Sequence, residues 1–378
     1  MRKIVIIPDS FKGTMRSGEI CRLVGQEVRR FFPDISILPI PVADGGEGTV
    51  DAFLAALPGE RIPVTVKNPF LEDMECFYGI TGQSNTAVIE MSSCAGLPLA
   101  EGRPDPSRTT TYGVGQMMTD AAKRGCTEII VGLGGSCTND CCAGAASACG
   151  IRFFDKDGNE FLPTGGSLSR VAHIDDSGLD PLLRRCRVTA MCDIDCTLYG
   201  ENGAAYLFAP QKGADADMVK LLDNGLRSIS AVIEHDLGKK SAALPGAGAA
   251  GGMGAGMDAF FGAGLKSGIE TLLDTIGFDD LARGADLIIS GEGRLDSQSL
   301  RGKAVIGTAH RAKKLGIPLI AVVGDICGDI SDVYEEGVTA VFSTNREAIP
   351  GSEAKKRSRE DLVLAVDNLM RLLSSLHV

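Results

Sequence analysis

Residues 128–140 read EIIVGLGGSCTND: a short β-branched run passes directly into a loop of glycines and polar residues. Runs without a polar face are typical of strands buried on both sides in a parallel sheet. Other apolar runs that lead into polar or glycine residues lie at 3–7, 35–40, 187–191, 286–289 and 319–323. Stretches predicted to be helices lie between or after them, at 17–32, 113–124, 302–315 and 359–376. This alternation predicts an α/β fold with ligands at the carboxyl ends of the strands.

Two stretches interrupt this alternation. Residues 60–90 are strand-rich with hairpin character, and we expect them to open a second domain. Residues 242–257 are rich in Gly and Ala, which fits a linker or a ligand-facing loop, and the glycine density favours the loop. A length of 378 residues also favours two domains.

The composition is that of an ordinary globular protein, with 44% hydrophobic and 23% charged residues and a mean hydropathy of +0.09. A net charge of −11 argues against a nucleic-acid or anionic-membrane partner. The amino-terminal apolar run is too short for a signal peptide, and no apolar run reaches membrane-spanning length. We therefore expect a cytoplasmic protein. The 12 cysteines include no Cys-x-x-Cys pair, so we interpret them as small, reduced core residues.

The loop Pro41-Val42-Ala43-Asp44-Gly45-Gly46-Glu47-Gly48-Thr49 follows one of the apolar runs. Its glycines allow close approach of the backbone to a ligand. Asp44 and Glu47 could hold a metal, accept substrate hydroxyls or take a proton.

The loops after the strands at 3–7 and 128–131 carry further candidates. Lys12 could neutralise a phosphate or carboxylate, and Asp9 and Ser10 could bind hydroxyls or water, although a plain strand-end turn is the alternative. Successive N–H groups at Gly134, Gly135 and Ser136 near a helix start could bind an anion. Asn139 and Asp140 could add a metal ligand or hydroxyl acceptor; helix capping is the alternative there.

Three more loops complete the set. Lys212 lies between turn residues in Pro210-Gln211-Lys212-Gly213. Residues 245–252 contain a formal G-x-G-x-x-G, but no clear strand precedes it, so a dinucleotide fingerprint is improbable and backbone contact with a nucleotide is favoured. Glu292 and Asp296, with Lys303 near a helix start, could contact Mg²⁺ and phosphates. A G-x-x-x-x-G-K-[ST] loop and protein-kinase signatures are absent from the sequence.

Taken together and in order, the motifs at 8–13, 41–49, 134–140, 210–213, 245–252 and 291–298 resemble the bacterial glycerate kinase type I family nearly end to end. The resemblance implies ATP-dependent, Mg²⁺-assisted phosphorylation of D-glycerate to 2-phosphoglycerate. It implies two α/β domains, one Rossmann-like with a parallel sheet formed by both chain ends (1–65 and 285–378), the other inserted (66–284), with the site in the cleft between them. A homodimer is one alternative for the assembly.

Residue roles follow from this resemblance and from the needs of phosphoryl transfer. Catalytic candidates are Asp193 or Asp44 as the general base, together with Lys12. Metal candidates are Glu292 and Asp296. Candidates for the substrate are Asp9, Ser10, Glu47, Asn139, Asp140 and Arg294. Candidates for the nucleotide are Gly134, Gly135, Ser136, Lys212, Gly248, Gly251 and Lys303. Lys12, Lys212 or Arg294 could also meet the glycerate carboxylate.

Two departures from the family pattern stand out. Similar kinases usually carry Gly-Gly where this chain has Cys141-Cys142, and they often continue toward Asn-Pro-Leu where it has Asp195 to Leu198. Two other functions fit parts of the sequence: a nicotinamide-dependent hydroxy-acid dehydrogenase, supported by the α/β rhythm and residues 246–251, and a non-catalytic sugar-acid binding protein.

Overall fold

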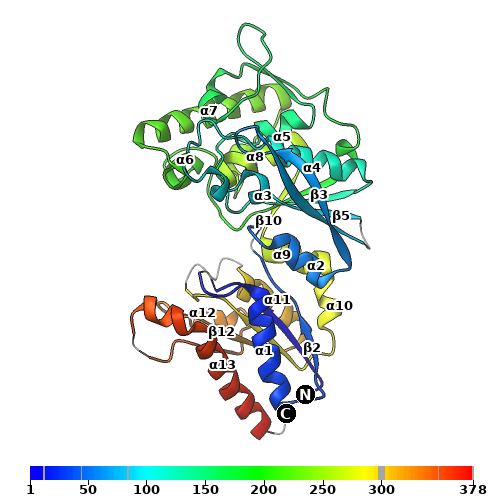
Figure 1. Cartoon of the computed structure of the whole chain (residues 1–378), viewed down its shortest axis with the longest axis vertical. Helices are drawn as coiled ribbons and strands as arrows, with labels where there is room; N and C mark the ends of the chain where they lie inside the picture. Colours follow the sequence, from blue (N-terminus) through cyan, green and yellow to red (C-terminus); the bar gives the residue numbers. More distant parts are fainter. Residues whose placement is uncertain (12, 44, 83–84, 297–302, 348, 377–378) are drawn as a thin grey trace. The chain divides into compact units, whose positions relative to one another are not determined.

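The computed structural model describes residues 1–378 except 12, 44, 83–84, 297–302, 348 and 377–378. The chain divides into two compact units, which we call unit 1 (residues 1–44 and 267–378) and unit 2 (residues 45–266). Each has its own sheet, and the α/β prediction is confirmed (Figure 1).

Unit 1 has a five-stranded parallel sheet built from both ends of the chain. Its strands, in spatial order, are β13 (Ala340–Ser343), β12 (Leu319–Val323), β11 (Leu287–Gly291), β1 (Lys3–Pro8) and β2 (Ser36–Pro39). Numbered in chain order within the unit, this is the doubly wound order 2-1-3-4-5. The direction in which successive strands are added reverses between β1 and β11. These two strands lie side by side although β1 opens the chain and β11 comes after unit 2 in the sequence.

Helices cover both faces of this sheet. α1 (Ser17–Phe31) and α13 (Gly351–Ser375) pack on each other and share a buried cluster with Ile4 and Ile6 of β1. The intervening Val5 and Ile7 are also fully buried, because successive strand residues point to opposite faces. On that second side α11 (Ala304–Leu315) contacts β1 and β11 and packs on α9 (Gly268–Ile276). The short helices α10 (Phe278–Ala282) and α12 (Asp332–Glu335) complete the unit.

Unit 2 has a six-stranded mixed sheet. Its spatial order is β10 (Gly264–Lys266), β9 (Arg187–Met191), β6 (Glu128–Gly132), β5 (Thr86–Glu90), β4 (Asp73–Thr81) and β3 (Gly59–Lys67). The first four strands are parallel, whereas β3, β4 and β5 are joined as antiparallel neighbours, as the hairpin character of residues 60–90 predicts. A separate ribbon pairs β7 (Arg152–Phe154) with β8 (His173–Asp175).

Small residues and helices fill the rest of unit 2. The helices are α2 (Thr49–Ala56), α3 (Ser92–Ala95), α4 (Tyr112–Lys123), α5 (Ala143–Ala148), α6 (Ala204–Phe208), α7 (Ala216–Leu237) and α8 (Ala249–Phe261). The 3₁₀ turns are η1 (Leu97–Ala100), η2 (Gly165–Arg170), η3 (Leu183–Arg185), η4 (Pro210–Lys212) and η5 (Ser241–Ala243). Nine of the twelve cysteines are buried, consistent with their interpretation as small core residues.

Several boundaries differ from those expected. The units divide at residues 44/45 and 266/267, whereas the sequence predicts domain boundaries at 65/66 and 284/285. β3 pairs along its length with β4 and α2 packs on β4 and β5, so residues 45–65 cluster with unit 2. α9 and α10 pack on each other and α9 packs on α11, so residues 267–284 cluster with unit 1.

Three helices also differ from prediction. α13 begins at Gly351, ahead of the predicted residue 359. The prediction started too late because the first turns of this helix are polar and lack the apolar period that indicates a helix. α7 lies outside the stretches predicted as helical; Asp215 caps it by accepting from the N–H of Met218. Part of the Gly- and Ala-rich stretch 242–257 belongs to α8. Within the described residues, no helix has the combination of length and apolar character needed to cross a bilayer.

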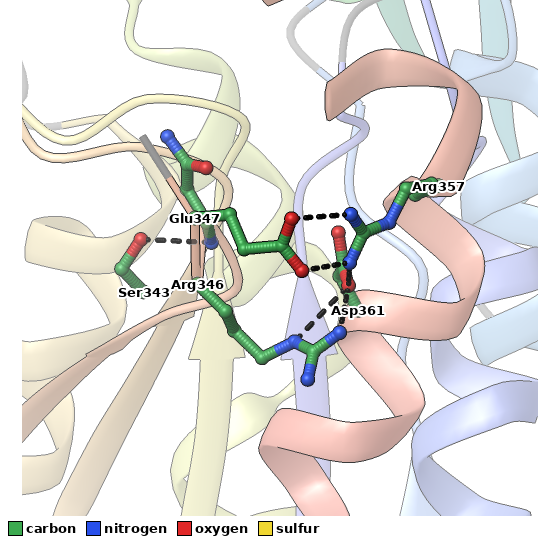
Figure 2. A network of polar contacts seen from close by, with 6 residues as sticks. Ser343, Arg346, Glu347, Arg357 and Asp361 are labelled. Atoms are coloured by element: carbon green, nitrogen blue, oxygen red, sulfur yellow. Dashed lines mark hydrogen bonds and ion pairs between the residues drawn. The ribbon is translucent and has the colours of Figure 1, made fainter. Parts of the chain in front are cut away.

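An arginine–carboxylate network ties the loop after β13 to α13 (Figure 2). Asp361 is buried and accepts from Arg346 at 2.7 and 3.1 Å and from Arg357 at 3.3 Å. Arg357 also forms a two-bond pair with Glu347 at 2.8 and 2.9 Å. One buried carboxylate therefore sits between two guanidinium groups and anchors the carboxyl end of the edge strand.

Asp361→Asn should lower the free energy of unfolding by about 2 kcal/mol, because charge-assisted hydrogen bonds at a buried acceptor are lost while the arginines stay half-exposed. Urea or thermal unfolding measures this, with Glu360→Gln on the exposed side of the same helix as the matched control. Equal stabilities of the two variants would show that solvent already screens the network.

Candidate functional site

In unit 1, the polar loops after β1 and β11 meet where the strand order reverses. The N–H of Asp9 donates to the carbonyl of Gly291 at 2.7 Å, which joins the two loops directly. Ser10 is partly buried beside Asp9, and Glu292 is buried, with 4% of its surface exposed. Ligands of open α/β sheets bind at this switch point, outside the carboxyl ends of the strands. The structure thus brings Asp9, Ser10 and Glu292 to one place.

The loop after β11 is held by the residues that directly follow the neighbouring strand β12. Gly324 N–H donates to the carbonyl of Glu292 at 3.0 Å, and Leu295 N–H donates to that of Asp325 at 2.9 Å. Arg294, a predicted substrate ligand, is exposed and forms an ion pair with Asp325 at 3.6 Å. Lys303 is partly buried at the start of α11, and Asp296 is partly buried on the loop. Lys12 and Asp44 lie outside the described residues.

In unit 2, glycines let two loops touch backbone to backbone. The N–H of Gly134 donates to the carbonyl of Gly45 at 3.0 Å, and a Cβ on Gly134 would lie 2.7 Å from the Cα of Gly46. Gly45 and Gly46 of the 41–49 loop therefore contact the residues that follow β6, whereas the sequence analysis expected the glycines of this loop to approach a ligand. Glu47 remains exposed beside this contact.

Glu90 is a site-edge residue that the sequence analysis missed. It ends β5, is buried, and accepts from the N–H of Val50 at 2.7 Å in the first turn of α2. Burial raises the pKa of Glu90, and hydrogen bonds from the Val50 and Gly48 backbones oppose that rise. A carboxylate at the end of an otherwise apolar strand was the signal that could have found it. Glu90 thereby fixes the residues that flank Glu47.

Asp140 lies at the starts of two helices. Its Oδ2 accepts from the N–H of Thr111 at 2.7 Å and from the N–H of Gly144 at 3.2 Å, which belong to the beginnings of α4 and α5. The hydroxyls of Thr111 and Thr110 donate to the same oxygen at 2.9 and 3.3 Å. Burial raises the pKa of Asp140, and these four hydrogen bonds oppose the rise. Helix capping, the alternative to substrate binding at Asp140, is therefore confirmed for its Oδ2 atom.

Lys212 is a buried cation on the same loop system. Its Nζ donates to Ser136 Oγ at 2.9 Å and to the carbonyl of Thr138 at 2.7 Å. Burial lowers the pKa of Lys212 to about 8, although the nearby carboxylate of Asp140 acts to raise it. Lys212 is thus brought from a distant part of the sequence onto the loop that carries Ser136, Asn139 and Asp140.

Four polar side-chain atoms of this loop are buried without a hydrogen-bonding partner in the described part of the chain. They are Thr138 Oγ1, both amide atoms of Asn139 and Asp140 Oδ1. Buried polar atoms are normally paired, so each needs an external partner or carries a cost of about 1–3 kcal/mol. A cluster of such atoms beside a lysine indicates a ligand site.

The glycine-rich segment packs against this loop. Gly251 has a φ of +69°, and a Cβ there would lie 2.1 Å from the carbonyl oxygen of Thr138. A Cβ on Gly248 would lie 2.2 Å from the carbonyl oxygen of Thr197. These glycines are required by close packing, whether or not a nucleotide also contacts them. Asp193 lies on an exposed turn after β9, next to the packed Cys192.

The described residues contain no group of three or more His, Cys, Asp or Glu side chains suited to a metal ion. Mg²⁺ does not require such a group, because it is held by one or two carboxylates plus substrate phosphates and water. Glu292 and Asp296 are hard oxygen donors on one loop and fit this mode of binding in chemistry.

The departure at Cys141-Cys142 has a structural consequence. Both residues are fully buried and adopt left-handed backbone conformations, with φ of 52° and 65°. L-residues other than glycine pay about 1–2 kcal/mol there. Cys142 directly precedes α5, and the absence of a side chain on Gly256 makes room for its Cβ.

Comparisons with known proteins agree over nearly the whole chain. The model of the glycerate kinase family matches residues 4–374. A glycerate 2-kinase of Escherichia coli K12 is 42% identical over 98% of each chain, and a glycerate kinase of Halalkalibacterium halodurans is 42% identical over 98% of this chain and 97% of its own. A crystal structure described as a glycerate kinase 2 from Salmonella typhimurium LT2 superposes with a TM-score of 0.87 at 38% identity, covering 100% of this chain and 99% of that one.

Cys142→Gly should be at least as stable as Cys142→Ala, because glycine relieves the left-handed strain that alanine keeps. The matched control is Cys149, which directly follows the same helix at a φ of −91°; there glycine should be roughly 0.4–1 kcal/mol less stable than alanine. Urea unfolding of the four variants measures both differences. A glycine penalty of equal size at both positions would refute the strain at Cys142.

Proposed function

The chain belongs to the glycerate kinase family, and from this premise we propose that it transfers the γ-phosphoryl group of ATP to the C2 hydroxyl of D-glycerate, giving ADP and 2-phosphoglycerate. The observation that carries the proposal is the similarity to glycerate kinases over nearly the full length of both chains. The buried polar cluster beside Lys212 adds support, because a kinase of a small hydroxy acid needs such a site.

Phosphoryl transfer asks the protein mainly for positioning and charge neutralisation. In the proposed reaction, the C2 oxygen forms a bond to the γ-phosphorus while the bond to the β,γ-bridging oxygen breaks, and ADP leaves. A carboxylate accepts the proton of the C2 hydroxyl. Asp193 suits this role because it is an exposed carboxylate at the carboxyl end of the parallel strand β9. Asp44 is the alternative base, and it lies outside the described residues.

Roles for the remaining loops follow from their charge. The backbone N–H of Gly135 is suited to a phosphate oxygen, as is the ammonium group of Lys303 at the start of α11. The N–H of Gly134 is already donated to the carbonyl of Gly45. Glu292 and Asp296 would hold Mg²⁺, which when bound neutralises phosphate charge. Asp9, Ser10 and Glu47 would accept or donate hydrogen bonds to substrate hydroxyls. The dehydrogenase alternative loses its specific sequence support, because close packing accounts for Gly248 and Gly251.

Incubating the wild-type chain with D-glycerate, ATP and Mg²⁺ should give 2-phosphoglycerate, identified by ¹H and ³¹P NMR, with matching ADP release. Asp193→Asn should lower kcat by about 100-fold or more, since it removes the general base. Asp195→Asn, two residues further along the same exposed turn, is the control and should stay within about threefold of wild type.

Each outcome has a distinct meaning. Absence of phosphoglycerate from the wild-type reaction would overturn the proposed function, and 3-phosphoglycerate would overturn its regiochemistry alone. Undiminished turnover by Asp193→Asn would remove Asp193 from the base role and leave the kinase assignment standing.

A further inference from the structure

The polar cluster around Lys212 has an unusual balance of charge. Its ammonium group has three donors, and two of them bind Ser136 Oγ and the carbonyl of Thr138. The buried carboxylate nearby is Asp140, whose Oδ2 is satisfied by four donors. Asp140 Oδ1 and one ammonium N–H remain to meet a ligand.

The thiols beside Lys212 do not supply a counter-charge. Burial raises the pKa of Cys137 to about 12 and that of Cys196 to about 11, so both thiols are neutral near pH 7. Lys212 therefore faces a single fixed carboxylate, and that carboxylate is already stabilised by two helix starts and two hydroxyls. The ammonium group thus keeps one N–H for an anionic partner.

The unpartnered atoms define the chemistry of that partner. Asn139 Nδ2 is a donor suited to a carboxylate oxygen, like the free N–H of Lys212. Asn139 Oδ1 and Asp140 Oδ1 are acceptors suited to hydroxyl groups, and Thr138 Oγ1 can act either way. A small acid with one carboxylate and adjacent hydroxyls matches this set. A triphosphate does not, because several negative charges would meet one ammonium group and the Asp140 carboxylate.

We infer that Thr138, Asn139, Asp140 and Lys212 bind the hydroxy-acid substrate, with Lys212 Nζ and Asn139 Nδ2 on its carboxylate and the Asn139 and Asp140 oxygens on its hydroxyls. This inference rests on the proposed function, and it assigns Lys212 to the acid site, where the sequence left it open between the nucleotide and the glycerate carboxylate. Lys212 then determines specificity for acids over uncharged polyols.

Entry of the acid requires local movement. Thr138, Asn139 and Asp140 have no exposed surface, and Cys141 N–H donates to the carbonyl of Gly251 at 3.1 Å, which holds the glycine-rich segment against the loop. The acid therefore binds as the segments packed on the loop shift, and it supplies the hydrogen bonds that the buried atoms lack.

Lys212→Met keeps the unbranched shape of the side chain, one atom shorter, and removes the charge. Calorimetry with D-glycerate and no nucleotide should show affinity about 100-fold weaker than wild type, as expected for a lost charged hydrogen bond. Steady-state assays should show a raised KM for D-glycerate, a KM for ATP within about threefold, and a similarly reduced preference for D-glycerate over glycerol. Lys220→Met, on the exposed side of α7, is the control and should match wild type.

A pH series on the wild-type chain gives a second measurement that needs no variant. The pKa of Lys212 is about 8, so its ammonium group is lost as pH rises through that value. The affinity for D-glycerate should fall from pH 7.5 to 9.5, approaching tenfold per pH unit, while Lys220→Met shows the same fall and Lys212→Met, if it folds, shows none.

The results separate this inference from the proposed function. A higher KM for ATP with unchanged D-glycerate affinity in Lys212→Met would return Lys212 to the nucleotide site and overturn the inference. Unchanged values for both ligands, or a flat wild-type pH series, would also overturn it. Absence of turnover in the wild type, with D-glycerate still bound in a Lys212-dependent way, would instead overturn the kinase function.

Discussion

One carboxylate oxygen, Oδ2 of Asp140, holds the structure of the candidate site together. It pairs with backbone N–H groups at the starts of α4 and α5 and with the hydroxyls of two threonines. Without it, two buried N–H groups would lose their acceptor, at about 1–3 kcal/mol each. These bonds determine the path of the loop between β6 and α5, including the left-handed turn at Cys141 and Cys142.

The same constraint prepares the chemistry of the site. Because Oδ2 is saturated, the buried charge of Asp140 is tolerated and Oδ1 stays available. Lys212 can then remain buried beside it with a pKa of about 8, balanced by a carboxylate that does not consume its last donor. The two carboxylate oxygens of Asp140 thus have separate roles: Oδ2 holds the loop in place, and Oδ1 is available to a ligand. The left-handed kink at Ala250, Gly251 and Gly252 in the first turn of α8 packs against this loop, because Gly251 has no Cβ to clash with the carbonyl oxygen of Thr138.

The strands were predictable from the sequence to within a residue or two at 3–7, 128–131, 187–191 and 319–323. Strands buried on both faces lack polar residues, so local sequence is sufficient to find them. Helices were harder. α13 starts with polar turns, and α8 is largely glycine and alanine, whose close packing has no apolar period. α7 lies outside the predicted stretches although its buried Val219, Leu222 and Leu226 keep a helical spacing, so the sequence did carry the signal for it. The boundary of unit 2 follows from the pairing of β3 with β4, which no local pattern specifies.

The sequence by itself determined the α/β class, the glycine-rich and acidic loops at strand ends, and membership of the glycerate kinase family, because these depend on local pattern and on motifs in order. Only the tertiary structure decided which side chain meets which. It made Asp140 a double helix cap, paired Arg294 with Asp325, placed Glu90 on the first turn of α2 and buried Lys212 beside Ser136. The physical reason is that burial and hydrogen-bond partners are set by residues far apart in the chain, and the chemistry of a charged group depends on those partners.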